Sequence, residues 1–194
     1  MLHKVANQDV DIRVYCEAAG MMPQLHNVCA PFSVPVYSCS GFDSLTAKYE
    51  LAQNIRETYA YQGRKTVVLH LGDYDPSGES IFSQGLVEDI YAFLEEDIPH
   101  HDPDEVAIFE RVAMLEDHAD EYGLETAPPK ESDSRTAGWK GSETCQLEAL
   151  PPDLLEALLV EAIDKHIDPE VYEEDCECEE EEAQRIAKAL PAPQ

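Results

Sequence analysis

The sequence predicts an α/β protein whose core is a mainly parallel sheet of four to five strands with helices on both faces. Short runs of β-branched and apolar residues alternate along the chain with longer stretches that have the 3.6-residue period of an amphipathic helix. One of these runs is almost continuously apolar, as in a parallel strand covered on both faces. Strands that alternate with helices in this way favour right-handed crossovers and a parallel sheet.

The first elements follow from the N-terminal pattern. Residues 10–16 form an alternating, β-branched run that predicts a strand ending at Glu17. We expect a short helix at residues 21–28 and a second strand at residues 33–38. A helix should follow from a Ser44 N-cap to about Tyr61, because its apolar residues recur on one face.

The middle of the chain repeats this alternation. A nearly continuous apolar run at residues 66–71 predicts the third strand, and the turn at residues 72–78 leads into a long helix. A fourth strand is expected within residues 106–114. The long helix is indicated by an apolar stripe with helical spacing, which consists of Phe82, Leu86, Ile90 and Phe93.

The last third of the chain is more polar. It starts with a loop at residues 124–141, followed by a short fifth strand expected around residues 145–147 and a leucine-rich helix at residues 153–166. Eight of the ten residues at 173–182 are acidic, a composition typical of a solvated helix or a disordered tail.

The chain is strongly acidic, with 41 Asp and Glu residues against 13 Lys and Arg residues, a formal net charge of −28 and a pI near 4.3. Residues 1–97 hold 14 acidic and 6 basic side chains, net −8, whereas residues 98–194 hold 27 and 7, net −20. This charge excludes a sequence-independent DNA or RNA coat, which holds phosphates with clustered Lys and Arg. Any nucleic-acid contact must be local or bridged by metal, and the first half is the better candidate.

Length and composition predict one domain with an appendage. The 194 residues, 43% of them hydrophobic, suffice for one core, so we expect an α/β domain over residues 1–167 and an acidic C-terminal helix or tail over residues 168–194. No apolar run approaches the roughly 18–20 residues of a membrane span, and residues 1–20 lack the pattern of a signal peptide. The six cysteines form no C-x-x-C pair, which favours reduced thiols. These features predict a cytoplasmic protein without membrane contact.

Two aspartates, Asp73 and Asp75, directly follow the third predicted strand. Carboxylates two residues apart on an extended chain point the same way, so this pair has the spacing to share a hard divalent cation. They come after a buried strand, and therefore at the carboxyl edge of the sheet, where open α/β folds bind ligands. Pro76, Ser77 and Gly78 then begin a helix whose free N–H groups can face an anion. The pattern predicts a phosphate site beside a metal site.

Glu17 also leaves a strand at its C-terminal end. If the second and third strands lie on opposite sides of the first, the first and third strands become neighbours and the switch point falls between Glu17 and the aspartates. The three carboxylates would then meet although about 56 residues separate them along the chain.

Several of these residues have a plainer alternative. Asp73 and Asp75 are also compatible with solvated loop aspartates, and His70, inside the third strand, is better explained as a packed histidine than as a base. Glu148, after the fifth predicted strand, is a distant fourth metal ligand.

The polar loop offers further candidates. Lys130 and Arg135 could contact phosphates, although a surface role in which Asp133 pairs with Arg135 is at least as compatible with the pattern. Trp139 could stack on a base, but a hydrophobic anchor for the loop is the favoured interpretation.

The sequence V-Y-C-E at residues 14–17, followed by L-G-D-Y-D-P-S-G at residues 71–78, resembles the Toprim domain shared by topoisomerases, primases and some nucleases. The closest branch is that of the topoisomerase VI A subunit, with its D-x-D-P-x-G signature. The resemblance covers roughly residues 10–165 and implies a Toprim-like Rossmannoid fold. Three further segments agree in their order: a small-residue turn at 40–44, E-R-V-A at 110–113 and D-S-R at 133–135.

Carried over position by position, the resemblance implies that Glu17 is the family's conserved acid and serves as metal ligand or general acid/base. Asp73 and Asp75 would bind Mg²⁺ or Mn²⁺. The metal would stabilise charge on a DNA phosphodiester during cleavage or rejoining, of the nuclease or topoisomerase type.

Two departures from that branch matter. Ala18 follows Glu17 where the branch usually has a basic residue, and only 16 residues precede Glu17, too few for the upstream winged-helix domain that carries the attacking tyrosine. We therefore expect either hydrolysis by an activated water or a partner subunit that supplies the nucleophile or DNA-binding domain. The main alternative is a non-catalytic subunit of this fold that docks a protein partner through its acidic second half. A phosphotransferase with aspartyl chemistry is a weaker alternative, because its nucleophile typically follows the first strand.

Overall fold

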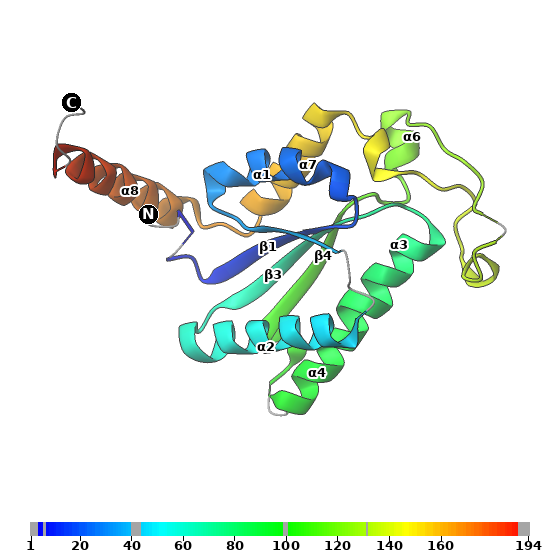
Figure 1. The fold of residues 1–194 in the computed structure, drawn as a ribbon, viewed down its shortest axis with the longest axis horizontal. Helices are drawn as coiled ribbons and strands as arrows, with labels where there is room; N and C mark the ends of the chain where they lie inside the picture. Colours follow the sequence, from blue (N-terminus) through cyan, green and yellow to red (C-terminus); the bar gives the residue numbers. More distant parts are fainter. Residues whose placement is uncertain (1–3, 6, 40–43, 99–100, 131, 190–194) are drawn as a thin grey trace.

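The computed structural model describes residues 4–5, 7–39, 44–98, 101–130 and 132–189. It confirms the predicted α/β class, with four parallel strands in the order β2-β1-β3-β4 and helices on both faces (Figure 1). The strands are β1 (Val10–Cys16), β2 (Val36–Ser38), β3 (Lys65–Leu71) and β4 (Ala107–Ala113). The predicted turn at residues 40–44 lies largely outside the described residues.

The sheet separates two hydrophobic cores. Val67, Leu69 and Leu71 of β3 point to one face, which is covered by α1 (Met22–Cys29) and α7 (Pro152–Asp164). Val68 points to the other, which is covered by α2 (Leu45–Gln62) and α4 (Asp89–Asp97). Because β3 is buried on both faces, its near-continuous apolar sequence is explained.

The long helix after β3 begins at Pro76 and continues to Asp97 through three consecutive pieces. These are α3 (Pro76–Ser80), a π-helical segment η3 (Ile81–Glu88) and α4. Apart from the C-terminal helix described below, the remaining helical elements are short: η1 (Ala19–Met21), η2 (Ala30–Phe32), α5 (Pro103–Val106), α6 (His118–Tyr122), η4 (Thr136–Gly138) and η5 (Leu147–Ala149).

The second strand is shorter than predicted. Ser33 takes a left-handed conformation with φ of 57°, and β2 begins only at Val36. Pro35 has no N–H to donate to a sheet ladder, which explains why pairing starts after it.

The expected fifth strand around residues 145–147 is wrong. Cys145 forms only an isolated antiparallel bridge with Tyr74, and Thr144 forms one with Ala127. The segment crosses the end of the sheet and pairs with the turn after β3, so it cannot extend the ladder of parallel strands. Leu147 then begins η5 instead of continuing as a strand.

The acidic C-terminal segment forms the helix α8 (Pro169–Ala189), which contacts Lys4 and Asn7 (Figure 1). Its one buried residue, Asp175, accepts a hydrogen bond of 2.5 Å from the Asn7 amide, and the Tyr172 hydroxyl donates to the Pro31 carbonyl at 3.0 Å. Residues 183–189 are exposed. Within the described ranges, no helix is both long and apolar enough to cross a membrane.

Glu110 on β4 ties the sheet to the end of α7. Lys165 Nζ and His166 Nε2 each lie 2.9 Å from its carboxylate oxygens. Burial acts to raise the pKa of Glu110, but the hydrogen bonds from Lys165 and His166 outweigh it and hold this pKa below its usual range. The carboxylate thus contributes stability that is present above the unfolded-state pKa of about 4.3 and is lost as the pH falls through the lowered folded-state value.

We expect Glu110→Gln to lower the free energy of unfolding by about 1 kcal/mol at pH 7, because this ion pair is partly exposed to solvent. The difference from wild type should shrink as the pH is lowered below 4. Urea denaturation at several pH values measures both effects. Glu156→Gln, at an exposed position of α7, is the control, and an equal loss in both variants at pH 7 would contradict the assignment.

Candidate functional site

The sheet order brings Glu17 to the turn that carries the two aspartates. β1 pairs in parallel with β3, with Cys16 opposite Leu71, and the Glu17 N–H donates to the Leu71 carbonyl at 3.0 Å. β2 lies on the other side of β1. The prediction that the first and third strands are neighbours is therefore confirmed, and Glu17 lies at the switch point of the sheet, where open α/β folds bind ligands.

Glu17 lies between a histidine and a glycine. Its Oε1 atom is 3.1 Å from Nε2 of His70, which is fully buried as predicted for a packed histidine. The Glu17 carboxylate and the His70 ring are not aligned for a hydrogen bond, so their contact is electrostatic. Burial lowers the pKa of His70, although Glu17 acts to raise it. A Cβ at position 72 would lie 2.2 Å from Glu17 Oε1, so Gly72 leaves the space that this carboxylate occupies.

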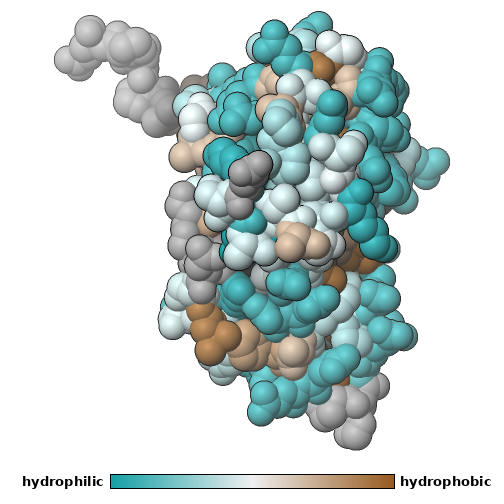
Figure 2. Space-filling model, turned by 90° about the vertical axis from the view of Figure 1, so that its right-hand side faces the viewer, coloured by the Kyte–Doolittle hydropathy of each residue, from teal (hydrophilic) through white to brown (hydrophobic). Residues whose placement is uncertain are grey.

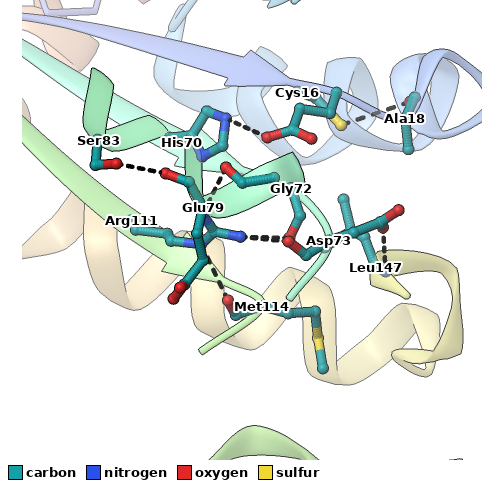
Figure 3. A network of polar contacts seen from close by, with 12 residues as sticks. Cys16, Ala18, His70, Gly72, Asp73, Glu79, Ser83, Arg111, Met114 and Leu147 are labelled. Atoms are coloured by element: carbon teal, nitrogen blue, oxygen red, sulfur yellow. Dashed lines mark hydrogen bonds and ion pairs between the residues drawn. The ribbon is translucent and has the colours of Figure 1, made fainter. Parts of the chain in front are cut away.

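The side chain of Asp73 is held by the main chain at Leu147. Its Oδ1 atom accepts a hydrogen bond of 2.8 Å from the main-chain N–H of Leu147 (Figure 3). Burial raises the pKa of Asp73, and the nearby carboxylates of Glu148, Asp75 and Glu17 raise it further. A carboxylate that is costly to ionise and lies among others is typical of a functional site, although structural networks also perturb pKa values.

Asp75 is the N-cap of α3. Its Oδ1 atom accepts a hydrogen bond of 2.7 Å from the Gly78 N–H. Since this donor is already used, a phosphate at the predicted anion site would compete with Asp75 for Gly78. The side chain of Ser77 accepts a hydrogen bond of 3.3 Å from Arg135, so the polar loop reaches the start of α3.

Gly78 allows two parts of the turn to touch. A Cβ at this position would lie 2.2 Å from the main-chain oxygen of Asp73 and 3.4 Å from Nη2 of Arg111. At such a short distance one of the two atoms would have to move, and a main-chain atom moves less easily than the end of a flexible side chain. The glycine of the D-Y-D-P-S-G sequence is therefore explained by packing inside the turn itself.

A cavity of about 480 Å³ opens beside the aspartates. Its wall includes the polar loop as well as the turn, and five of its lining side chains are acidic, Glu125 among them. The other charged side chains that line it are Asp73, Asp75, Lys130, Asp133 and Glu148. The distant candidate Glu148 therefore shares a cavity with the two aspartates, whereas Glu17 is not among its lining residues.

Trp139 attaches the polar loop to the molecule. Its Nε1 donates to Glu79 at 2.7 Å, and its ring lies 5.2 Å from that of Tyr74. The interpretation of Trp139 as an anchor is favoured over that of a base-stacking platform. The side of the molecule that carries this loop is predominantly hydrophilic, with small hydrophobic patches (Figure 2).

Carboxylate oxygens are the ligands that Mg²⁺ and Mn²⁺ prefer, so Glu17, Asp73 and Asp75 fit such a cation by chemistry. In the described part of the chain, however, no group of three or more His, Cys, Asp or Glu side chains is arranged to hold a metal ion. Each of the three carboxylates instead contacts a different neighbour. Binding a shared cation would require at least one of them to turn away from its present contact.

Arg111 is the site residue that sequence reasoning missed. It lies opposite His70 in the β3–β4 register. Its guanidinium bonds to the main chain of the turn at residues 72–78, which we call the acidic turn (Figure 3). The available signal was a basic residue in the predicted fourth strand, next to the charged Glu110.

Comparisons with protein-family models, with curated proteins and with solved structures found no significant match to this chain.

The packing at Gly78 generates a stability prediction. We expect Gly78→Ala to lower the free energy of unfolding by about 2–3 kcal/mol, because its Cβ overlaps a main-chain oxygen and overpacking of this kind costs about 1–3 kcal/mol or more. This loss should appear although alanine has the better helix propensity, by about 1 kcal/mol. Chemical denaturation measures it.

Gly20→Ala is the matched control, since a Cβ there meets no atom within 4 Å. It should leave stability unchanged within about 0.5 kcal/mol. Equal stability of the two variants would show that the turn is looser than described.

Proposed function

We propose that this chain is a Mg²⁺- or Mn²⁺-dependent DNA-processing protein of the Toprim class that acts in the cytoplasm and takes part in cleaving or rejoining phosphodiester bonds. The observation that carries the proposal is the pairing of β1 with β3, because it puts Glu17 beside the Asp73 and Asp75 turn at the switch point of a parallel sheet. The same residues carry the resemblance in sequence.

In this proposal Asp73, Asp75 and Glu17 hold the cation. The cation would stabilise the charge that develops on the phosphodiester and offset the repulsion between DNA and an acidic protein. Asp73 and Asp75 are partly satisfied by the Leu147 and Gly78 N–H groups, which orient them while leaving their second oxygens for a ligand. The carboxylate of Glu17 would turn from His70 toward the aspartates.

The polar loop and the start of α3 would contact the substrate. Arg135 bonds to Ser77 and is about half exposed, so its charge can reach a phosphate next to the turn. Lys130 lines the cavity that Asp73 and Asp75 share. Together with Ser77 and Gly78, these two cations are the proposed phosphate contacts.

The attacking group is proposed to be water or to come from a partner subunit. Tyr74, between the two aspartates, is 7% exposed and bonds through its main chain to Cys145, so it is unsuited to attack a phosphodiester. A partner that supplies the nucleophile or a DNA-binding domain would also provide the positive charge that this chain lacks.

A second candidate function is docking of a protein partner without catalysis. The acidic stretch of α8 at residues 173–182, most of which is exposed or half-buried, is the feature that favours it. This candidate predicts no cleavage by the chain and no dependence on the aspartates.

We expect the purified chain to nick or linearise supercoiled plasmid when Mg²⁺ or Mn²⁺ is added, and to lose this activity when the metal is removed with a chelator. Asp73→Asn and Asp75→Asn should each lower the rate at least 100-fold, because removal of one charge-stabilising group costs roughly 10²–10³ in rate. Glu17→Gln should have a similar effect. Gel electrophoresis of the plasmid and calorimetry with Mn²⁺ are the two measurements.

Asp153→Asn is the matched control, since this aspartate is exposed at the start of α7 and away from the cavity. It should retain wild-type cleavage and Mn²⁺ affinity. Cleavage that is equal in wild type and Asp73→Asn would reject catalysis at this site. Mn²⁺ binding without cleavage would favour the requirement for a partner subunit.

A further inference from the structure

Arg111 contacts the acidic turn through main-chain oxygens alone. Its Nε donates to the Met114 carbonyl at 3.0 Å and its Nη1 to the Gly78 carbonyl at 3.0 Å. Its Nη2 donates to the carbonyl of Asp73 and, at 3.4 Å, to that of Gly72 (Figure 3). In the described part of the chain, none of its hydrogen bonds goes to a carboxylate.

These carbonyls belong to the ends of three elements that meet here. Gly72 and Asp73 follow β3, Gly78 belongs to α3, and Met114 follows β4. Buried main-chain carbonyls need partners, and a single planar group with five N–H donors can meet several of them in one fixed geometry. A lysine ammonium carries the same charge but has neither the reach nor the fork shape.

The guanidinium is itself held in place. It packs over the ring of Phe82, 5.8 Å from the ring centre. Its strand is paired with β3 in a register that puts Arg111 opposite His70. Arg111 is thus fixed by its own strand and by the π-helical segment, in addition to its bonds to the turn.

The contacts of Arg111 reach both aspartates indirectly, through the main chain of the turn. It holds the carbonyl of Asp73, whose side chain bonds to Leu147, and the carbonyl of Gly78, whose N–H bonds to Asp75. Because Arg111 occupies main-chain oxygens, the second carboxylate oxygen of each aspartate stays available for a ligand. Its positive charge also lies near Asp73, Asp75 and Glu17, where it offsets part of the repulsion between these carboxylates.

We propose that Arg111 is the positioning residue of the acidic turn: its bonds to the Gly72, Asp73 and Gly78 carbonyls hold the Asp73 and Asp75 carboxylates in their present directions. The first consequence, order in the turn, is independent of any function. The second consequence, a higher affinity for a divalent cation, rests on the proposed function.

Hydrogen exchange of two amides tests the first consequence. We expect Arg111→Lys to speed exchange of the Leu147 and Gly78 N–H groups at least tenfold, because these groups donate to Asp73 and Asp75. Exchange of core amides such as that of Leu69 should change only with global stability. Ile90→Val, in the other core, is a control that lowers stability without touching the turn.

A milder variant keeps the test decisive if Arg111→Lys does not fold. Phe82→Leu removes the ring under the guanidinium and should speed exchange of the same two amides by a smaller factor, about threefold. If neither variant speeds exchange at Leu147 and Gly78 beyond the Ile90→Val control, the positioning role is overturned. Faster exchange that is uniform over all core amides would also overturn it.

Calorimetry with Mn²⁺ tests the second consequence. Arg111→Lys should weaken Mn²⁺ binding at least tenfold, whereas Ile90→Val should bind as wild type does. If wild type takes up no Mn²⁺, the proposed function fails while the exchange result still decides the role of Arg111. If wild type binds Mn²⁺ and Arg111→Lys binds it equally well, the second consequence is rejected.

Discussion

The pairing of β1 with β3 is the interaction on which the site depends. The ladder continues past the strand ends, because the Glu17 N–H bonds to the Leu71 carbonyl and the Gly72 N–H bonds to the Ala113 carbonyl at 2.8 Å. Gly72 is therefore held between the chains that follow β1 and β4, and it has no side chain to keep Glu17 away. A turn fixed on both sides can present two carboxylates with little loss of conformational entropy on ligand binding.

The same pairing concentrates like charges at one point. Glu17, Asp73, Asp75 and Glu148 are close enough that each of the other three raises the pKa of Asp73, after the larger effect of burial. A carboxylate whose pKa is raised by folding opposes folding at pH values above its unfolded-state pKa, so ionised Asp73 costs stability at neutral pH. Arg111 offsets part of this repulsion. A cluster of like charges that lowers the stability of the fold is more typical of a binding site than of a structural one.

Much of the fold could be predicted because hydrophobic periodicity reports burial directly. The continuous apolar run before Asp73 and the helical stripe of Leu86 and Ile90 both lie where expected. The expected strand near Cys145 was wrong, since a short apolar segment does not reveal whether its partner is a strand or a turn. Arg111 could not be assigned to the site because it bonds to main-chain carbonyls. Every residue has such a carbonyl, so the sequence does not show which of them a side chain will contact.

Hydrogen bonds connect the polar loop and the segment after it to the acidic turn. The loop is joined to the turn and to α3 by Arg135 on Ser77 and by Trp139 on Glu79, and the chain that follows the loop is joined to the turn by the Leu147 N–H bond to Asp73. Two of these three bonds end on carboxylates. In the proposed function, a cation bound at Asp73 would compete with the Leu147 N–H for negative charge, so uptake of the ion would be coupled to the position of the segment that follows the loop, and the coupling would be reciprocal. Any phosphate that the loop holds would then also alter the affinity of the turn for the cation.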